Sequence, residues 1–281
     1  MNYDYLIPLV KRWVAGKTLD EALIVARQAN MKGYYVVLNY LGEEITDEKQ
    51  IRHTVLEYKK IIDVIRREKI NAAIALKLTQ LGLSLNESLC EDNLNEIVKY
   101  AKNNKLTVWI DMENSKYTDK TIKIYLEFLK EYDEIGVAIQ AYLKRGFELA
   151  KLVAANDGMI RLVKGAYKEP SSIVYTSKEE INRNFNEIMQ YLFEKRIRLE
   201  LGTHDEKLVY NAIKLILKTK HNIEFAFLRG IRNDLKSWLV KEGFKVVEYI
   251  PYGPSWKDYV YRRIREKRSN ILLALTSIFT K

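Results

Sequence analysis

Short runs of apolar and β-branched residues alternate along the chain with longer segments whose apolar positions recur at helical spacing. In one longer segment, Val55, Tyr58, Ile62 and Ile65 share one helical face, as expected of an amphipathic helix. The short runs predict eight strands, at Tyr34–Leu38, Ala72–Lys77, Thr107–Asp111, Ile135–Ile139, Ile160–Lys164, Arg198–Gly202, Ile223–Leu228 and Lys245–Ile250. Such alternation is typical of βαβ units, in which helices cover a parallel sheet.

Eight strands, each followed by a helix, predict a (βα)8 barrel, and 281 residues are enough for one such domain. The alternative is an open, doubly wound sheet, which usually carries a glycine-rich phosphate loop after its first strand. Because no GxGxxG occurs in the sequence, the barrel is favoured. No linker rich in Pro, Gly or Ser divides the chain, so residues 1–281 are expected to form a single domain.

Helical segments are predicted on both sides of the eight strands. Thr18-Leu-Asp-Glu21 reads as a capping box that opens a helix within an extra N-terminal segment, about 1–32. After the last strand, a helix is expected from about Ser255 to Lys267, followed by an apolar helical tail, about 268–281. The tail would pack on the barrel, mediate assembly or touch a membrane, and packing on the barrel is favoured.

Composition indicates a globular protein with a sizeable core, since 47% of residues are hydrophobic and 30% are charged. Cys90 is the single cysteine, which excludes an intrachain disulfide, and no Cys/His grouping predicts a metal site. The start lacks a secretory leader and no stretch approaches 18 apolar residues, so a cytoplasmic protein is expected.

The net charge of +10 raises two further expectations about partners. Basic residues are interspersed with acidic ones and no DNA- or RNA-binding motif accompanies them, so nucleic-acid binding is not expected. The basic charge and the apolar tail would both favour peripheral contact with the inner face of a membrane.

Polar residues stand at the ends of most predicted strands, where the active site of a (βα)8 barrel lies. A charge that ends a buried strand is costly unless it is paired or functional. Each of these residues alone would be explained by pairing with a neighbour, as between Lys77 and Asp111, but six strand ends of the same kind indicate a site. These residues are Lys77, Asp111, Gln140, Arg161 with Lys164, Thr203 with His204, and Tyr249.

The adjacent Arg262 and Arg263 lie on the helix predicted after the eighth strand. Adjacent helical side chains diverge by about 100°, so both reach one ligand only if this helix crosses the barrel mouth. Taken alone, the pair is more typical of a solvated face. Beside Lys77 it indicates a carboxylate or phosphate ligand, to which arginine forks are suited.

Two motifs and several shorter stretches form one pattern that runs from about Tyr34 to Asn270. Shorter stretches of the same kind are Leu41-Gly-Glu43, the run from Ala75 to Gly82, the run that ends at Glu113, and Gln140-Ala-Tyr-Leu143. The two motifs are Arg161-Leu-Val-Lys-Gly-Ala-Tyr167 with Glu169-Pro170, and Tyr249-Ile-Pro-Tyr-Gly253 with Trp256 and Tyr259-x-x-Arg-Arg-x-x-Glu266. Together they resemble the signatures of the proline dehydrogenase family.

The resemblance implies a distorted (βα)8 barrel with FAD across its mouth. Such an enzyme oxidises L-proline to 1-pyrroline-5-carboxylate by hydride transfer to flavin N5 and passes the electrons to a quinone. Functional coupling to a separate pyrroline-5-carboxylate dehydrogenase is a metabolic expectation only. This chemistry needs no nucleophile or metal, only a substrate held against the flavin by its far end.

The resemblance also implies a role for each matching residue. Asp111 and Arg161 would be the catalytic residues, with Arg161 beside flavin N5. Glu43 would gate the site through an ion pair with Arg262. The substrate would contact Lys77, Tyr167, Leu228, Tyr249, Tyr259, Arg262 and Arg263. The cofactor would contact Met112, Gln140, Arg161, Lys164, Gly165, Ala166, Thr203 and His204.

One motif departs from the family pattern. After the seventh predicted strand, Ala226-Phe-Leu-Arg-Gly230 replaces the usual Gln-Met-Leu-Tyr-Gly, so contacts from Ala226 and Arg229 are in doubt while Leu228 is retained.

Two other functions stay open. One alternative is a flavin-dependent barrel enzyme for hydroxyproline or a folate, against which Tyr249 argues. The other is a basic binding protein on a barrel scaffold. The chain lacks the further parts of large bifunctional relatives, so a monofunctional enzyme is expected.

Overall fold

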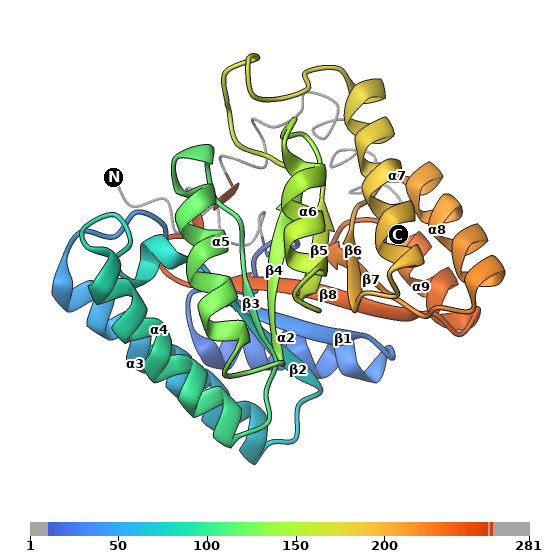
Figure 1. The fold of residues 1–281 in the computed structure, drawn as a ribbon. Coiled ribbons are helices and arrows are strands. Elements are labelled where there is room, and N and C mark those ends of the chain that lie inside the picture. The colour runs from blue at the N-terminus through green and yellow to red at the C-terminus, as the bar shows by residue number, and fades with distance from the viewer. Residues whose placement is uncertain (1–10, 258, 261–281) are drawn as a thin grey trace.

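Eight parallel strands close into a barrel in which each strand pairs with its neighbours in sequence order (Figure 1). The structure is a computed structural model that describes residues 11–257, 259 and 260. The last strand returns to the first, with register partners that run from Tyr35 and Val247 to Tyr40 and Tyr252. The (βα)8 barrel predicted from the alternating pattern is therefore confirmed, and the open sheet is excluded.

Among the described residues, strands and helices alternate from Leu19 onward, with one additional 3-10 turn between the second and third strands. The strands are β1 (Tyr35–Tyr40), β2 (Ala72–Leu76), β3 (Val108–Ile110), β4 (Ile135–Gln140), β5 (Met159–Val163), β6 (Leu199–Gly202), β7 (Glu224–Leu228) and β8 (Lys245–Tyr252). The helices are α2 (Leu19–Met31), α3 (Glu48–Arg67), α4 (Glu87–Asn103), α5 (Ser115–Leu129), α6 (Gly146–Ala154), α7 (Lys178–Glu194), α8 (Glu206–Thr219), α9 (Asn233–Lys241) and the 3-10 turn η2 (Leu78–Leu81).

All eight predicted strands are present, and three of them end one residue early. Lys77, Asp111 and Lys164 follow their strands instead of ending them. Lys77 precedes the turn η2 with its carbonyl bound by the Gln80 amide, so the chain leaves the ladder at this point. These charged side chains consequently stand at the rim of the barrel.

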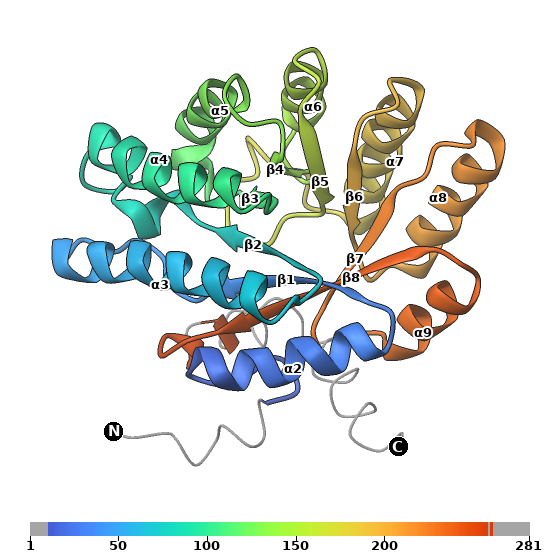
Figure 2. The same ribbon diagram turned by 90° about the horizontal axis from the view of Figure 1, so that it is seen from below.

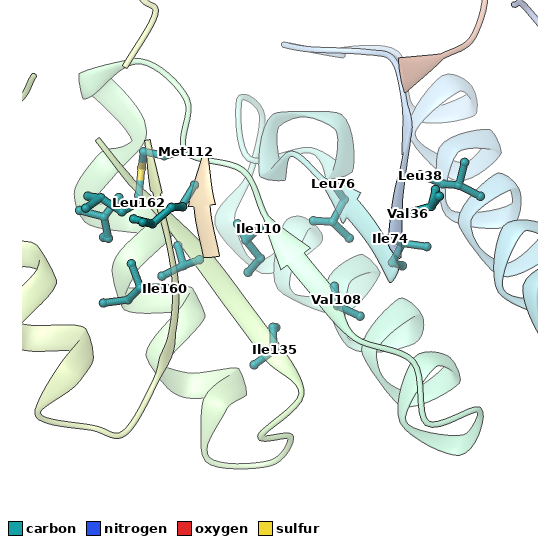
Figure 3. Close-up of a cluster of buried hydrophobic side chains, with 14 of the residues drawn as sticks. Val36, Leu38, Ile74, Leu76, Val108, Ile110, Met112, Ile135, Ile160 and Leu162 are labelled. Carbon is teal, nitrogen blue, oxygen red and sulfur yellow. The ribbon is translucent and has the colours of Figure 1, made fainter. Parts of the chain in front are cut away.

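Strand residues alternate between two apolar layers, as the two-residue period of a strand requires. One set packs outward against the helices and includes Val36, Leu38, Ile74, Leu76, Val108 and Ile110 (Figure 3). The other set fills the barrel and includes Val37, Ala73, Ala75, Trp109, Met159 and Val247. Trp109 occupies space left by small neighbours, because a Cβ on Gly136 would lie 2.4 Å from its ring.

The helix α2, which precedes β1, completes the ring of helices around the barrel (Figure 2). The predicted capping box is present, with Glu21 N–H donating to the Thr18 hydroxyl and the Glu21 carboxylate accepting from Thr18 N–H. Ala22, Ala26 and Ala29 lie on the buried face, and their small side chains let α2 approach β1 and β8 closely. The helix therefore covers the junction between the first and last strands.

The segment after β8 begins a helix at the predicted place. Trp256, Lys257, Tyr259 and Val260 are helical. The rest of the helix predicted from about Ser255 to Lys267, and the tail about 268–281, lie outside the described residues. No helix within residues 11–257, 259 and 260 has the length and apolar character needed to cross a membrane.

A buried ion pair joins α9 to β8 on the outside of the barrel. The Lys236 ammonium contacts a Glu248 carboxylate oxygen, and the two side chains are 0% and 8% exposed. Burial lowers the pKa of Lys236, and Glu248 opposes that shift. The Lys236 ammonium also lies 5.5 Å from the centre of the Tyr34 ring. Lys236 is therefore held by charge and ring contacts within an otherwise apolar layer.

We expect Glu248→Ala to lower the free energy of unfolding by about 3–5 kcal/mol, because it leaves a buried ammonium without its counter-charge. Glu127→Ala is the matched control, since it breaks an ion pair with Lys130 whose side chains are 60% and 69% exposed. Urea unfolding of both variants provides the test. Equal stability of the two variants would show that Lys236 does not depend on Glu248.

Candidate active site at the barrel mouth

Asp111 is the centre of a polar cluster at the carboxyl ends of the strands. The Tyr249 hydroxyl donates to its Oδ2 at 2.5 Å, and Arg161 Nη1 donates to its Oδ1 at 3.3 Å. The Lys77 ammonium lies 3.7 Å from Oδ2. The structure thus brings together four residues that the sequence places up to 172 positions apart. The pairing of Lys77 with Asp111, which alone would explain these two charges without a function, is present.

Arg161 is held on several sides. Its Nε and Nη2 donate to the two carboxylate oxygens of Glu200, at 2.5 and 3.3 Å. Its guanidinium carbon lies 4.4 Å from the centre of the Trp109 ring and 5.5 Å from that of Tyr249. Burial alone would lower the pKa of Arg161, but Glu200 and Asp111 raise it above its usual value. Arg161 therefore stays charged.

Sequence reasoning missed Glu200, although a signal for it exists. It stands between Leu199 and Leu201 in β6, so its side chain points to the opposite face from theirs. In a closed barrel that face is the interior, where it lies beside Arg161, its partner in the register of β5 and β6. Burial raises the pKa of the Glu200 carboxyl, and Arg161 opposes that shift.

Tyr249 acts as a neutral hydrogen-bond donor in this cluster. Burial first, and then the charge of Asp111, raise the pKa of its hydroxyl well above the usual value, although Arg161 opposes the shift. A phenol that keeps its proton can donate to Asp111 across the physiological pH range. Leu228 is its register partner on β7 and is half-buried.

Glu113 is a second buried carboxylate near the mouth. Its side chain accepts from the backbone N–H of Thr79 at 3.1 Å and contacts the Thr79 hydroxyl. The Thr79 hydroxyl in turn accepts from Glu44 N–H at 2.8 Å. Burial raises the pKa of Glu113 to about 7, with a smaller contribution from Glu43 in the same direction, while Thr79 and Lys77 oppose it. Glu113 thus anchors the loop that carries Glu43.

A group of polar residues from β5, β6 and α8 lies on another side of the mouth. Lys164 forms an ion pair of 2.7 Å with Asp205, which caps α8 by accepting from Lys207 N–H. His204 Nε2 accepts from Leu228 N–H at 3.0 Å, which assigns the proton to Nδ1 when the ring is neutral. Thr203 is buried beside them. The predicted cofactor residues of this group therefore share one side of the mouth.

Residues 164–177 form a long loop over the strand ends, drawn in yellow-green above β5 in Figure 1. Gly165, near the start of the loop, has a φ of +102°, which favours glycine. A side chain would also not fit here, since a Cβ would lie 2.2 Å from the Tyr142 ring. Further along, both carboxylate oxygens of Glu169 bind the start of α5, at 2.6 Å from Ser115 N and from Ser115 Oγ. This contact ties the loop that carries Tyr167 to the neighbouring helix.

The remaining predicted residues have different surroundings. Met112 packs its side chain with Leu162 in the layer between sheet and helices (Figure 3), so a cofactor would meet its backbone. Tyr259 is buried with Leu41 and Trp256, and Ala166 is exposed. Arg262 and Arg263 lie outside the described residues, and so does the predicted ion pair between Glu43 and Arg262. Glu43 itself is half-buried on the loop after β1.

The altered motif after the seventh strand also has a structural outcome. Ala226 is part of the apolar cluster inside the barrel. Arg229 donates from Nε to the carbonyl of Lys11 at 3.2 Å, and burial lowers its pKa. Arg229 thus binds the N-terminal segment, in keeping with the doubt about its role in the site.

The residues at the mouth fit a flavin nucleotide by their chemistry. Gln140 is 3% exposed, and within the part of the chain that the structure describes its carbonyl oxygen has no hydrogen-bond partner. A buried acceptor of this kind awaits a donor, which a flavin ring provides. Lys164 is a cation suited to a phosphate group. Among the described residues, no group of three His, Cys, Asp or Glu side chains is placed to hold a metal ion.

The fold and this cluster define a (βα)8-barrel protein whose functional residues lie at the carboxyl ends of its strands, the usual place of a barrel enzyme's active site. The family model for proline dehydrogenase matches residues 22–272. The chain belongs to the proline dehydrogenase family. It is therefore an oxidoreductase of proline catabolism.

Individual relatives agree with this family. Proline dehydrogenase 1 of Bacillus subtilis is 33% identical, over 96% of this chain and 91% of that protein. Proline dehydrogenase of Deinococcus radiodurans is 29% identical, over 93% of this chain and 87% of that protein. The crystal structure of proline utilization A from Bdellovibrio bacteriovorus, inactivated by N-propargylglycine, has the same fold, with a TM-score of 0.87 and 22% identity. The match covers 94% of this chain and 33% of that chain.

Glu113 should make stability depend on pH. Its pKa rises from 4.5 to about 7 on folding, so the folded state binds the extra proton, and stability is lost as the pH rises from about 4.5 through 7. We expect Glu113→Gln to remove a loss of up to roughly 3 kcal/mol between pH 5 and pH 8. Urea unfolding at both pH values tests this, with exposed Glu131→Gln as the control. Parallel pH profiles for Glu113→Gln and the unsubstituted protein would contradict it.

Glu169→Ala should loosen the loop of residues 164–177. Hydrogen bonds that involve a charged group contribute about 1.5–3 kcal/mol, so we expect chymotryptic cleavage after Tyr175, in the same loop but away from the substituted position, to become at least about tenfold faster. The site of cleavage is followed by mass spectrometry. Glu179→Ala, an exposed position on the first turn of α7, is the control. Equal cleavage rates in the two variants would show that Glu169 does not hold the loop.

Proposed function

We propose that this protein oxidises L-proline to 1-pyrroline-5-carboxylate with FAD as its cofactor and passes the electrons to a quinone. The observation that carries the proposal is the cluster of Lys77, Asp111, Arg161 and Tyr249 at the barrel mouth. It combines two cations, a carboxylate and an aromatic face in the space where the family's substrate would bind. The family relationship supports proline as the substrate.

The substrate's carboxylate would be held by cations at the rim. Lys77 follows β2, and its ammonium lies 3.7 Å from Asp111, a distance at which its hydrogen atoms are not committed to a short bond with that carboxylate. Arg262 and Arg263 would complete the clamp. A substrate fixed at its carboxylate presents the opposite side of its ring for reaction, and positioning of this kind supplies a large part of catalysis.

The remaining substrate-binding residues would enclose the ring of the bound proline. Tyr249 presents a flat ring that is fixed by its bond to Asp111, with Leu228 beside it on β7. Tyr167 on the loop of residues 164–177 and Tyr259 after β8 would close the other sides. Tyr249 would stand against the ring carbon that carries the hydroxyl in 4-hydroxyproline, and it therefore favours unsubstituted proline.

FAD, when bound, would supply the acceptor for the hydride that leaves the proline Cδ. Gln140, with its buried carbonyl oxygen, and Arg161, with its guanidinium, would bind the flavin ring. Lys164, Thr203 and His204 would hold the rest of the nucleotide, along with Gly165, Ala166 and the backbone of Met112. A fixed guanidinium beside the flavin would stabilise negative charge that develops on reduction.

Two partners follow from this function. A quinone acceptor lies in a membrane, and the net charge of +10 favours peripheral contact with an anionic surface. The product would pass to a separate pyrroline-5-carboxylate dehydrogenase.

Glu43 would gate the site by pairing with Arg262 at its entrance.

The purified protein should be yellow, and anaerobic addition of L-proline should bleach the flavin absorbance. Lys77→Met should raise the KM for proline at least about 30-fold, since loss of one partner of a desolvated charge contact costs roughly 2–5 kcal/mol. Lys99→Met, an exposed lysine on α4, is the control and should match the unsubstituted enzyme. A protein that binds no FAD, or a bound flavin that proline does not reduce, would overturn the proposed function.

A further inference from the structure

Glu200 lies beneath the candidate active site in the barrel interior and has no part in the function proposed above. Its side chain is 2% exposed, and that of Arg161 is 5% exposed. The two carboxylate oxygens of Glu200 bind two different nitrogens of Arg161, at 2.5 and 3.3 Å. Paired, two-point contacts of this kind fix the plane of a guanidinium as well as its position.

The hydrogen atoms of Arg161 show how completely Glu200 constrains it. A guanidinium has five N–H groups. Two of them bind Glu200 and one binds Asp111, and the face of the group lies against Trp109. Within the described part of the chain, two N–H groups, one on Nη1 and one on Nη2, therefore remain for a ligand at the mouth. Without Glu200, the plane of the guanidinium would be set by one hydrogen bond to Asp111 and by its contact with the Trp109 ring.

Charge is balanced by the same contact. Lys77 and Arg161 carry two positive charges, and Asp111 and Glu200 carry two negative ones. Removal of the Glu200 charge would leave a net positive charge in a buried cluster, where fields are screened far less than in water. The electrostatic potential at a flavin bound beside Arg161 would therefore become more positive.

We propose that Glu200 is a positioning residue that fixes the orientation of Arg161 and offsets part of the positive charge that Arg161 presents to the flavin. The inference rests on the proposed function, because it takes the flavin to lie beside Arg161. Its consequence is that Glu200 makes the bound flavin harder to reduce than Arg161 alone would, while it keeps the guanidinium aimed at the mouth.

The test is the midpoint potential of the bound FAD in Glu200→Gln, measured by anaerobic dye-coupled titration. Glutamine keeps the shape of the side chain and one acceptor oxygen but removes the charge. We expect FAD to remain bound and its reduced form to gain at least tenfold in affinity relative to the oxidised form, which is a positive shift of about 30 mV or more. We also expect kcat to fall about tenfold, with KM for proline changed less than twofold.

Two further variants separate positioning from stability. Glu134→Gln is the matched control, since Glu134 binds Arg198 by two contacts of 2.8 Å on the more exposed side of the barrel, and it should leave the potential unchanged. Glu200→Asp retains the charge but shortens the reach. It should keep the potential near that of the unsubstituted enzyme and still lower kcat.

Unchanged potential and kcat in Glu200→Gln, with only a lower melting temperature, would overturn the inference and leave Glu200 a structural residue. If Glu200→Gln does not fold, Glu200→Asp decides the matter, because unchanged kcat in that variant would contradict the positioning role. Failure of the unsubstituted protein to bind FAD or to be reduced by proline would instead overturn the proposed function. The two failures are therefore distinguishable.

Discussion

Closure of the parallel sheet is the constraint on which the rest of this structure depends. A strand ladder that returns from β8 to β1 leaves no open edge, so all eight strands must have compatible register and the enclosed space must be filled. Trp109 beside Gly136 and the alanines of β2 meets the second condition. Closure also directs every carboxyl end to one rim, and residues distant in sequence become neighbours there.

Charges inside such a barrel persist only in balanced sets. Arg161 lies between Asp111 and Glu200, and Lys77 adds a second cation at the rim. Removing one member of a buried set leaves an uncompensated charge, which costs far more than the pair itself contributes. Lys236 and Glu248 follow the same rule outside the barrel, where they join α9 to β8. The candidate active site differs from this pair less by its charges than by its place at the barrel mouth and by buried polar atoms that have no hydrogen-bond partner among the described residues.

Loops over the mouth are anchored to the rigid part of the fold. Glu169 joins the loop of residues 164–177 to the start of α5. Thr79 connects the loop after β1 to the buried Glu113. A site built in this way combines strand residues with fixed positions and loop residues that close the space above them, and catalytic residues on loops of a rigid scaffold are a general arrangement. Because folding raises the pKa of Glu113 to about 7, the stability of this arrangement depends on pH.

The sequence by itself determined the eight strands, the capped helix before them and the polar residues at the strand ends, because periodicity and capping are local properties of the chain. It also carried the motifs that resemble the family, and the fold agreed with what they imply. The tertiary structure alone decided that α2 covers the junction of β1 and β8, that Glu113 is wholly buried, and that Glu200 binds Arg161. A pattern in the sequence states which face a residue occupies, whereas its partner across the barrel depends on how the closed sheet sets the register of distant strands.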